Sequence, residues 1–221
     1  MRAPPPVDWL VPCSLIVLSL VPVMAGVSRI AGLAAGGQGA PLDARFFVSP
    51  APVVIHIVAA SVFCLLGAFQ FATGIRKRHP RWHRIAGRLL VPCGLVAALA
   101  GLWMTRFYPN AVNGGDLLFN LRLFFGSAML ISLVMAVAAI RRRDFVRHGA
   151  WMIRAYAVGQ GAGTQVLTSL PWIVLIGVPG VTANALLLGA GWVINVVIAE
   201  WIIYRFLARP VCPSGAEPKA A

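Results

Sequence analysis

Two histidines stand in matching positions after two short basic turns and are the clearest chemical signal in the sequence. His83 follows the turn that begins Ile75-Arg76-Lys77-Arg78, and His148 follows the turn that begins Ile140-Arg141-Arg142-Arg143. Each histidine comes eight residues after its isoleucine. Two neutral imidazoles brought to one depth from different helices could ligate the iron of a b-type haem. The spacing therefore indicates a two-histidine ligand site.

Arginines surround both histidines and leave the ligand open. Arg88 and Arg154 follow His83 and His148 inside the next apolar runs, where they would reach the propionates of a haem. The same basic groups would also suit a quinone-type ligand or lipid phosphates. Histidine is moreover an ordinary residue of the membrane interface, so a site without any ligand is a further alternative. The cofactor is thus unknown, with haem b or a quinone as candidates.

A few polar residues interrupt the apolar runs and need partners, because ionisable groups inside a membrane are costly. Glu200 is the one acid in the middle of an apolar run, and Arg154 is its expected bidentate partner. This pair would either fix two helices together or let Glu200 carry a proton or orient a histidine. We expect Gln70, Asn195 and Gln160 to complete one intramembrane polar cluster with Glu200.

His56 stands apart from the other histidines. About 25 Å of helix separates its level from that of the pair, so it cannot share a metal with them. We expect a hydrogen-bonded core histidine at this position.

Composition identifies the elements that must position these groups. The chain has 221 residues, 59% of them hydrophobic and 11% charged, and its mean hydropathy is +0.82. These values are typical of an integral membrane protein, and we expect an all-α, polytopic bundle of transmembrane helices. The loops are short, which makes neighbouring helices antiparallel. Six apolar runs are candidate spans: about 9–31, 51–74, 85–106, 116–140, 149–175 and 182–206.

The cations predict the orientation of this bundle. With the first span entering from the cytoplasm, 15 of the 19 lysines and arginines fall on the inner side and 4 on the outer side. The positive-inside rule then places both termini in the cytoplasm. It also accounts for the net charge of +13 without a nucleic-acid partner. The first run resembles a signal peptide in part, but its length favours a retained anchor.

The matching basic turns also suggest an internal repeat. Each lies in a hairpin that runs from outside to inside and back, so a duplication would be parallel, with its axis along the membrane normal. The expected organisation is a first transmembrane helix and outer loop (1–49), a five-helix membrane domain (50–206) and a short cytoplasmic tail (207–221).

The sequence contains no motif for disulfide, metal or hydrolytic chemistry based on cysteine, serine or phosphate-binding loops. The cysteines stand singly, and we expect neither a disulfide nor a cysteine-held metal; they are Cys13, Cys64, Cys93 and Cys212. P-loop, G-x-S-x-G and H-E-x-x-H motifs are absent from the sequence. We therefore predict no catalytic residue, and an enzyme is the less favoured class.

Several of these motifs together resemble a known family over about residues 50–206. They are His56, Gly67–Phe71, Arg76–Arg78, His83-Arg84-x-x-Gly87-Arg88, Arg147-His148-x-x-Trp151-Met152-x-Arg154, Asn195 and Ala199–Trp201. The combination is similar to the bacterial predicted membrane proteins of the DUF2306 family, which have no established reaction. The resemblance implies an arginine where this chain has Gln165. More distantly, the bundle is similar to b-type cytochromes and ferric reductases, whose cross-membrane ligand pairs are missing here.

These observations lead to one functional hypothesis and two alternatives. The first is a redox-associated accessory module of the bacterial inner membrane that binds haem b or a quinone-type ligand near the cytoplasmic leaflet through His83 and His148. The alternatives are a non-catalytic assembly or accessory subunit and a small-solute transporter. The expected partners are membrane lipids and a larger membrane complex.

Overall fold

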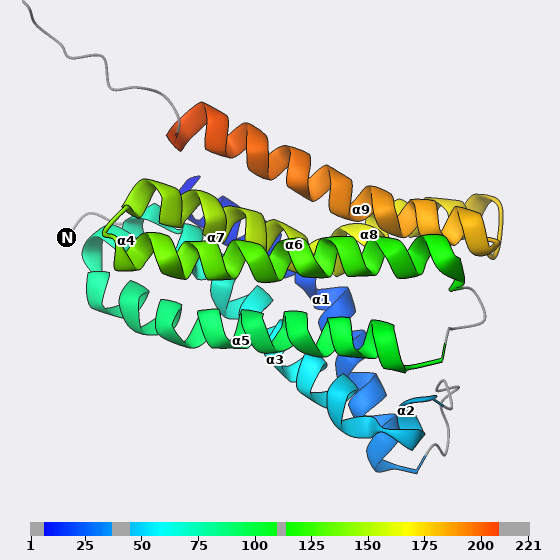
Figure 1. Ribbon diagram of the computed structural model, residues 1–221. Helices are drawn as coiled ribbons and strands as arrows, with labels where there is room; N and C mark the ends of the chain where they lie inside the picture. Colours follow the sequence, from blue (N-terminus) through cyan, green and yellow to red (C-terminus); the bar gives the residue numbers. More distant parts are fainter. Residues whose placement is uncertain (1–6, 37–44, 110–113, 208–221) are drawn as a thin grey trace, which may run out of the picture.

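The computed structural model describes residues 7–36, 45–109 and 114–207, and all regular structure in these ranges is helical. The long helices run lengthwise through one bundle (Figure 1). In chain order the elements are α1 (Val7–Ala34), α2 (Arg45–Val48), α3 (Pro50–Ala68), η1 (Phe69–Phe71), α4 (Thr73–Arg78), α5 (Pro80–Phe107), α6 (Gly115–Arg141), α7 (Phe145–Gly159), α8 (Gly161–Leu175), α9 (Val181–Ile202) and the π-helix η2 (Ile203–Leu207).

Five helical segments in the described part of the chain are long and apolar enough to cross a membrane. They are Trp9–Ala34, Pro50–Phe71, Pro80–Phe107, Gly115–Arg141 and Val181–Arg205. They coincide with five of the six apolar runs that the sequence predicts as spans. The all-helical class and the membrane character of the protein are therefore confirmed.

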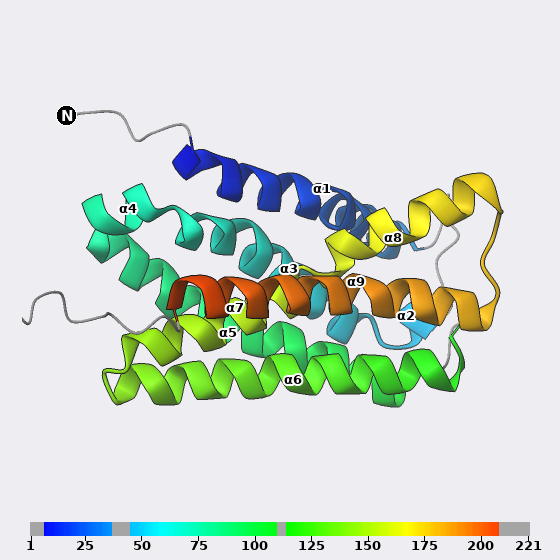
Figure 2. The same ribbon diagram turned by 90° about the horizontal axis from the view of Figure 1, so that it is seen from above.

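The remaining predicted span, 149–175, is not one helix. It is divided at Gln160 into α7 and α8, each of 15 residues. Such a helix is about 22 Å long, which is shorter than the roughly 30 Å hydrocarbon core of a bilayer. Figure 2 shows α7 starting at the end where α6 finishes, and α8 finishing at the opposite end, where α9 starts. The two helices together thus run the length of the bundle.

Close packing of glycines explains where this division falls. A Cβ atom at Gly159 would lie 2.9 Å from the ring of Phe63 on α3. One at Gly161 would overlap the Trp192 indole, and one at Gly163 would overlap the Leu18 carbonyl oxygen. The glycines are needed for this approach, and they also lower helix propensity. We conclude that the residues that let three helices approach also weaken the helix between α7 and α8.

Side chains from other helices bind the carbonyl groups that this division frees. The Asn195 amide on α9 donates to the Ala157 carbonyl oxygen at 3.0 Å. The Cys64 thiol on α3 donates to the Gly159 carbonyl oxygen at 3.4 Å. An unpaired carbonyl group would be costly in a bilayer, where no water replaces the lost partner. Asn195 and Cys64 therefore make the interrupted helix tolerable.

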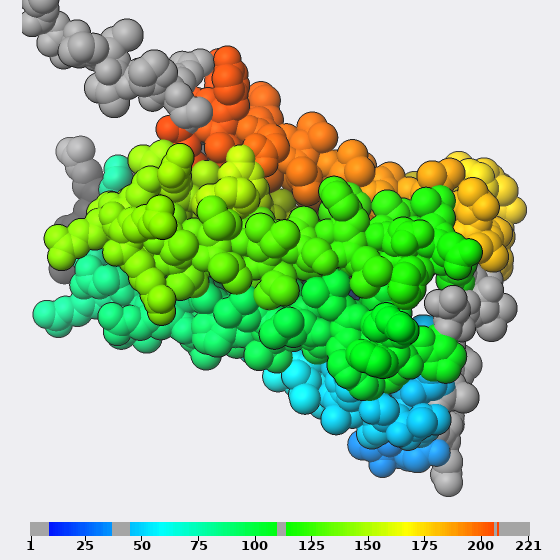
Figure 3. Space-filling view, viewed as in Figure 1, coloured from blue at the N-terminus to red at the C-terminus, as the bar shows by residue number. Residues whose placement is uncertain are grey.

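The helices close into a ring. α3 packs on α1 and α5, α6 packs on α5 and α9, and α8 packs on α9 and α1. α7 contacts α3, α6 and α9, and the main core lies there, around the buried side chains Phe63, Leu90, Leu133 and Tyr156. Figure 3 shows the face formed by α5 and α6, with α9 along one edge. Because lipid is as apolar as these side chains, tight packing and hydrogen bonds hold the ring together.

One end of the bundle is strongly basic. It contains α4, the start of α5 and the turn from α6 to α7 (Figure 1), and we call it the basic end. α1 also starts there and α9 finishes there (Figure 2). The described chain thus begins and ends on one side of the bundle. That the basic end faces the cytoplasm stays a prediction, and the predicted tail lies outside the described residues from 208 onward.

Candidate functional site

His83 and His148 occupy the same position in their helices. Each is the fourth helical residue, counted from Pro80 in α5 and from Phe145 in α7. The backbone N–H of His83 donates to the carbonyl oxygen of His79 at 3.2 Å, and that of His148 donates to Asp144 at 2.9 Å. Both helices start at the basic end (Figure 1). The spacing seen in the sequence therefore becomes a matching register in the structure.

The ring of His148 is fixed by a neighbouring helix. Its Nδ1 atom lies 3.0 Å from the carbonyl oxygen of Ala136 on α6. A carbonyl oxygen only accepts, so this bond needs the proton on Nδ1 and leaves Nε2 as the lone-pair nitrogen of a neutral ring. Histidines that bind metals commonly have this arrangement.

His83 lies within electrostatic range of His148 as well as of Arg76 and Arg84. Its Nδ1 atom is buried without a hydrogen-bond partner among the described residues, and so is the Nε2 atom of Gln70 in η1. η1 lies beside the start of α5, because the rings of Phe69 and Trp82 are in edge contact at 6.4 Å. The described part of the basic end therefore contains two buried polar nitrogen atoms without a hydrogen-bond partner.

The two arginines predicted at this site have different surroundings. Arg88 is exposed on α5. Arg154 is paired with Glu200, since its Nε and Nη2 atoms donate to the two carboxylate oxygens at 2.6 and 2.8 Å. The Arg154 guanidinium also lies over the Trp151 ring at 4.6 Å. The predicted bidentate pair is confirmed, and it joins α7 to α9.

Gln160 is buried and fully engaged beside the division of α7 from α8. Its amide nitrogen donates to the Tyr156 hydroxyl at 2.8 Å and to the Leu15 carbonyl oxygen at 3.3 Å, and its oxygen accepts from Ser19 at 3.0 Å. The Tyr156 hydroxyl donates in turn to the Cys64 carbonyl oxygen at 2.7 Å. Gln160 therefore ties α7 to α1 and, through Tyr156, to α3.

Asn195 is held beside the same division. Its side-chain oxygen accepts from the Thr164 hydroxyl at 2.7 Å, and its amide donates to Ala157. Among the described residues, no hydrogen bond joins Asn195 or Gln160 to Glu200. The residues predicted as one polar cluster thus fall into separate groups, and two of them stabilise the interrupted helix.

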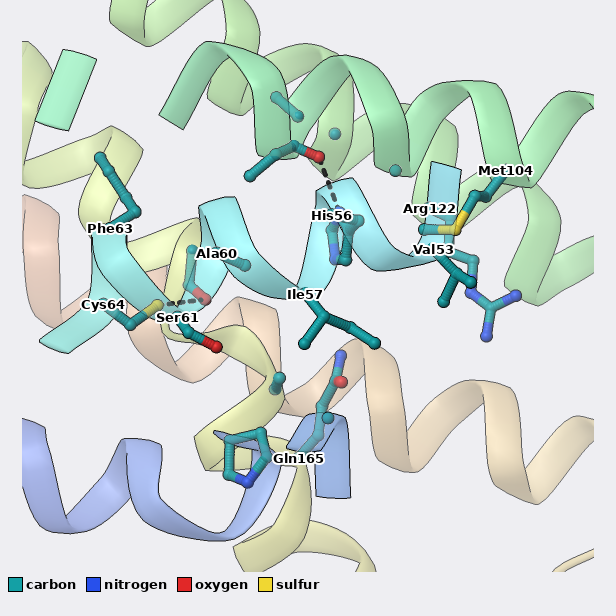
Figure 4. Close-up of a pocket in the computed structure, with 18 of the residues that line it drawn as sticks. Val53, His56, Ile57, Ala60, Ser61, Phe63, Cys64, Met104, Arg122 and Gln165 are labelled. Atoms are coloured by element: carbon teal, nitrogen blue, oxygen red, sulfur yellow. Dashed lines mark hydrogen bonds between the residues drawn. The ribbon is translucent and has the colours of Figure 1, made fainter. Parts of the chain in front are cut away.

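A cavity of about 500 Å³ lies inside the ring of helices. Sequence reasoning missed it, although three polar residues in different apolar runs line it: His56, Arg122 and Gln165 (Figure 4). The Nδ1 atom of His56 lies 2.8 Å from the Ala97 carbonyl oxygen, which confirms the predicted hydrogen-bonded histidine. Neither His83 nor His148 lines this cavity.

The cysteines give no sign of metal chemistry in the described part of the chain. Cys13, Cys64 and Cys93 are free thiols, and Cys212 lies outside the described residues. No group of three or more His, Cys, Asp or Glu side chains in the described ranges could hold a metal ion. The described residues would therefore supply at most two such side chains to a metal at the basic end.

Comparison with known proteins identifies a family for this chain. No curated protein and no solved structure matches the chain. The family described as "Predicted membrane protein (DUF2306)" matches residues 53–203, which is well over half of the sequence and includes His56, His83, His148 and Glu200. The chain therefore belongs to the DUF2306 family of predicted membrane proteins.

Proposed function

We propose that this protein is a redox-associated accessory module of the membrane that binds a quinone-type ligand or haem b at the basic end, through His83 and His148. The observation that supports it best is the matching register of the two imidazoles. The hydrogen bond to the Ala136 carbonyl group uses the Nδ1 proton of His148 and leaves its Nε2 lone pair available to a ligand.

The unpaired donors favour the quinone over the haem. The oxygens of a quinone would accept hydrogen bonds from the buried nitrogens of His83 and Gln70, and in the reduced quinol form a hydroxyl group would donate to the Nε2 lone pair of His148. For haem, His83 lacks the Nδ1 partner that His148 has, and Arg154 is already paired with Glu200. Pairing two buried donors would gain about 1–3 kcal/mol for each.

The test is to measure what co-purifies with the full-length protein in a mild detergent. Quinone would be extracted and quantified per protein chain, and a reduced-minus-oxidised spectrum would detect haem. We expect near-stoichiometric quinone in the wild type and its loss in His83→Asn and His148→Asn. The control is His79→Asn, because His79 is exposed in the turn before α5 and should keep the ligand.

The outcomes separate the two ligands. A b-type haem band in the wild type that disappears in both variants would show that the ligand is haem and not a quinone. Absence of both quinone and haem, or equal loss in the control, would refute the two-histidine site.

A non-catalytic accessory subunit is the second candidate, and the Arg154–Glu200 pair favours it. This pair joins α7 to α9 and needs no ligand, as do the saturated hydrogen bonds of Gln160. In that case the double variant His83→Ala/His148→Ala would migrate with the same partners as the wild type when membrane complexes are separated by size. Loss of a chromophore in the variant would contradict it.

Transport of a small solute finds weaker support. Transporters with internal repeats often have interrupted helices in corresponding positions. Here the interruption at Gln160 lies in the second hairpin, whereas α5, its counterpart in the proposed parallel repeat, is continuous from Pro80 to Phe107. We therefore rank transport third.

We further propose that α7 and α8 together form a sixth crossing. The basic end then faces the cytoplasm of a bacterium, in the inner membrane. Support comes from the course of the two helices along the bundle (Figure 2) and from the basic residues gathered at one end.

A further inference from the structure

The central cavity is long rather than round. On α3 its lining extends from Val53 to Cys64, which is eleven residues or about 16 Å of helix. Its volume of about 500 Å³ falls within the range of sites for small organic ligands. Side chains such as Ile57, Phe63 and Met129 make most of its wall apolar. These dimensions suit a chain-like molecule better than a single ion.

One end of the cavity is cationic. Arg29, Arg45 and Arg122 line it there, at the end of the bundle opposite the basic end. The guanidinium groups of Arg29 and Arg45 each lie 4.7 Å from the ring centre of Phe46, so one aromatic ring holds both cations at this end. The charges of Arg45 and Arg122 are near enough to repel each other. An anion at this place would be attracted by all three arginines.

Arg122 is the residue that most needs such an anion. It is half-buried on α6, and Figure 4 shows it on the cavity wall with Val53 and Met104. Within the described ranges it forms no hydrogen bond or ion pair. A half-buried guanidinium among apolar side chains costs free energy unless an anion pairs with it.

The opposite end of the cavity lies against the interrupted helix and is mostly apolar, and its polar side chains Ser19 and Gln160 are hydrogen-bonded to each other. Phe63, Met129, Val158 and Gly159 line it. The carbonyl group of Gly159 accepts a hydrogen bond from Cys64, so this end offers few free polar groups. The cavity thus combines a cationic end and an apolar end about 16 Å apart along α3.

We propose that this cavity binds a long-chain carboxylate, with its head group at Arg122 and its hydrocarbon chain directed toward Phe63 and Gly159. An amphiphile of this kind satisfies both ends at once. The carboxylate pairs with a planar guanidinium through two hydrogen bonds, and the chain fills space that water would otherwise occupy. This site is separate from His83 and His148, so the result does not depend on whether they bind a ligand.

The experiment measures equilibrium binding of radiolabelled oleate to the full-length protein in nanodiscs of phosphatidylcholine. We expect saturable binding that weakens about tenfold or more in Arg122→Gln, because a charged hydrogen-bond partner is lost. Arg122→Lys keeps the charge and should restore much of the affinity. The matched control is Arg106→Gln. Arg106 is in the last turn of α5, on the same side of the bundle as Arg122, but it packs on Phe107 and does not line this cavity.

Two further arms test the chain and the head group separately. Ala60→Phe places a ring in the cavity without touching the arginines, and it should weaken oleate binding to a similar degree. Oleyl alcohol has the same chain without a charge and should compete poorly. Lysophosphatidylglycerol that displaced oleate at lower concentrations than oleate itself would overturn the carboxylate assignment. Equal loss in Arg106→Gln, or unchanged binding in Arg122→Gln, would overturn the site.

Discussion

Asn195 illustrates how one side chain stabilises an interrupted helix. It is buried on α9 and bonds to both Thr164 and the Ala157 carbonyl group. Asn195→Leu would leave that carbonyl group and the Thr164 hydroxyl unpaired, and we expect the free energy of unfolding to fall by about 1–3 kcal/mol. Reversible unfolding in mixed detergent micelles measures this loss. Ile194→Leu, on the exposed side of the same helix, should change little, and equal stability of both variants would contradict the assigned role.

The Arg154–Glu200 pair makes a second prediction at the residue scale. Its two short hydrogen bonds suggest coupling, yet the Glu200 side chain is 48% exposed, which limits the gain. We expect a double-mutant cycle with Arg154→Gln and Glu200→Gln to give a coupling free energy of about 0.5–1 kcal/mol. The Arg147–Asp144 pair is 3.8 Å apart with a far more exposed arginine, and it should give almost none. Equal coupling in the two pairs would show that bidentate geometry contributes nothing here.

The sequence predicted some of these contacts and not others, for physical reasons. Glu200 is the one acid within an apolar run, and few cations lie at its depth, so Arg154 could be predicted as its partner. The partners of Gln160 and Asn195 could not, because they include backbone carbonyl groups on α1 and at the end of α7. A carbonyl oxygen has two lone pairs and can accept a side-chain hydrogen bond even within a helix, so hydropathy does not mark which carbonyl group a neighbouring helix will approach.

At the scale of elements, substitution of glycines can distinguish the effect of close helix packing from the effect of low helix propensity. A Cβ atom at Gly163 would overlap the backbone of Leu18, which cannot move as a flexible side chain can. We expect Gly163→Ala to destabilise the protein by about 1–3 kcal/mol. Gly87→Ala on α5 is the control, because nothing lies within 4 Å of its Cβ position, and it should be neutral or stabilising. Thermal unfolding of both variants in detergent measures the difference. A Gly163→Ala protein as stable as the wild type would contradict the close approach of α1.

Hydropathy located the long helices well but not the interruption. An apolar run longer than about 18 residues must be helical in a bilayer, so the five spans follow from composition. Residues 149–175 are apolar on both sides of Gln160, and glycine is common in transmembrane helices, so its presence alone does not end one. The interruption depends on Phe63, Trp192 and Leu18, which approach from three other helices.

At the scale of the whole molecule, the course of the chain can be tested directly. If α7 and α8 together cross the membrane, then Arg142 and Val178 lie on opposite sides. Single cysteines at these exposed positions, introduced into a cysteine-free protein in intact cells, should differ in labelling by a membrane-impermeant maleimide. We expect Val178→Cys to react from outside and Arg142→Cys to react only after lysis. Labelling of both from one side would exclude the sixth crossing.

The cavity also belongs to this scale, because no single segment encodes it. Its lining comes from α1, α2, α3, α5, α6, α7, α8 and α9. His56, Arg122 and Gln165 are far apart in sequence and share no spacing that would mark a site. Only the closed ring of helices brings them to one space, which explains why the sequence predicted the histidine bond but not the cavity beside it.

The shortness of α7 and α8 bears on how the protein is made. Neither half-helix can span the hydrocarbon layer alone, so neither should leave the translocon as an independently stable unit. The Ala157 carbonyl group acquires its partner on α9 only once Asn195 has been synthesised. If α7 and α8 together cross the membrane, a nascent chain that stops before Asn195 would leave the Ala157 carbonyl group unpaired in lipid and would be a substrate for quality-control proteolysis.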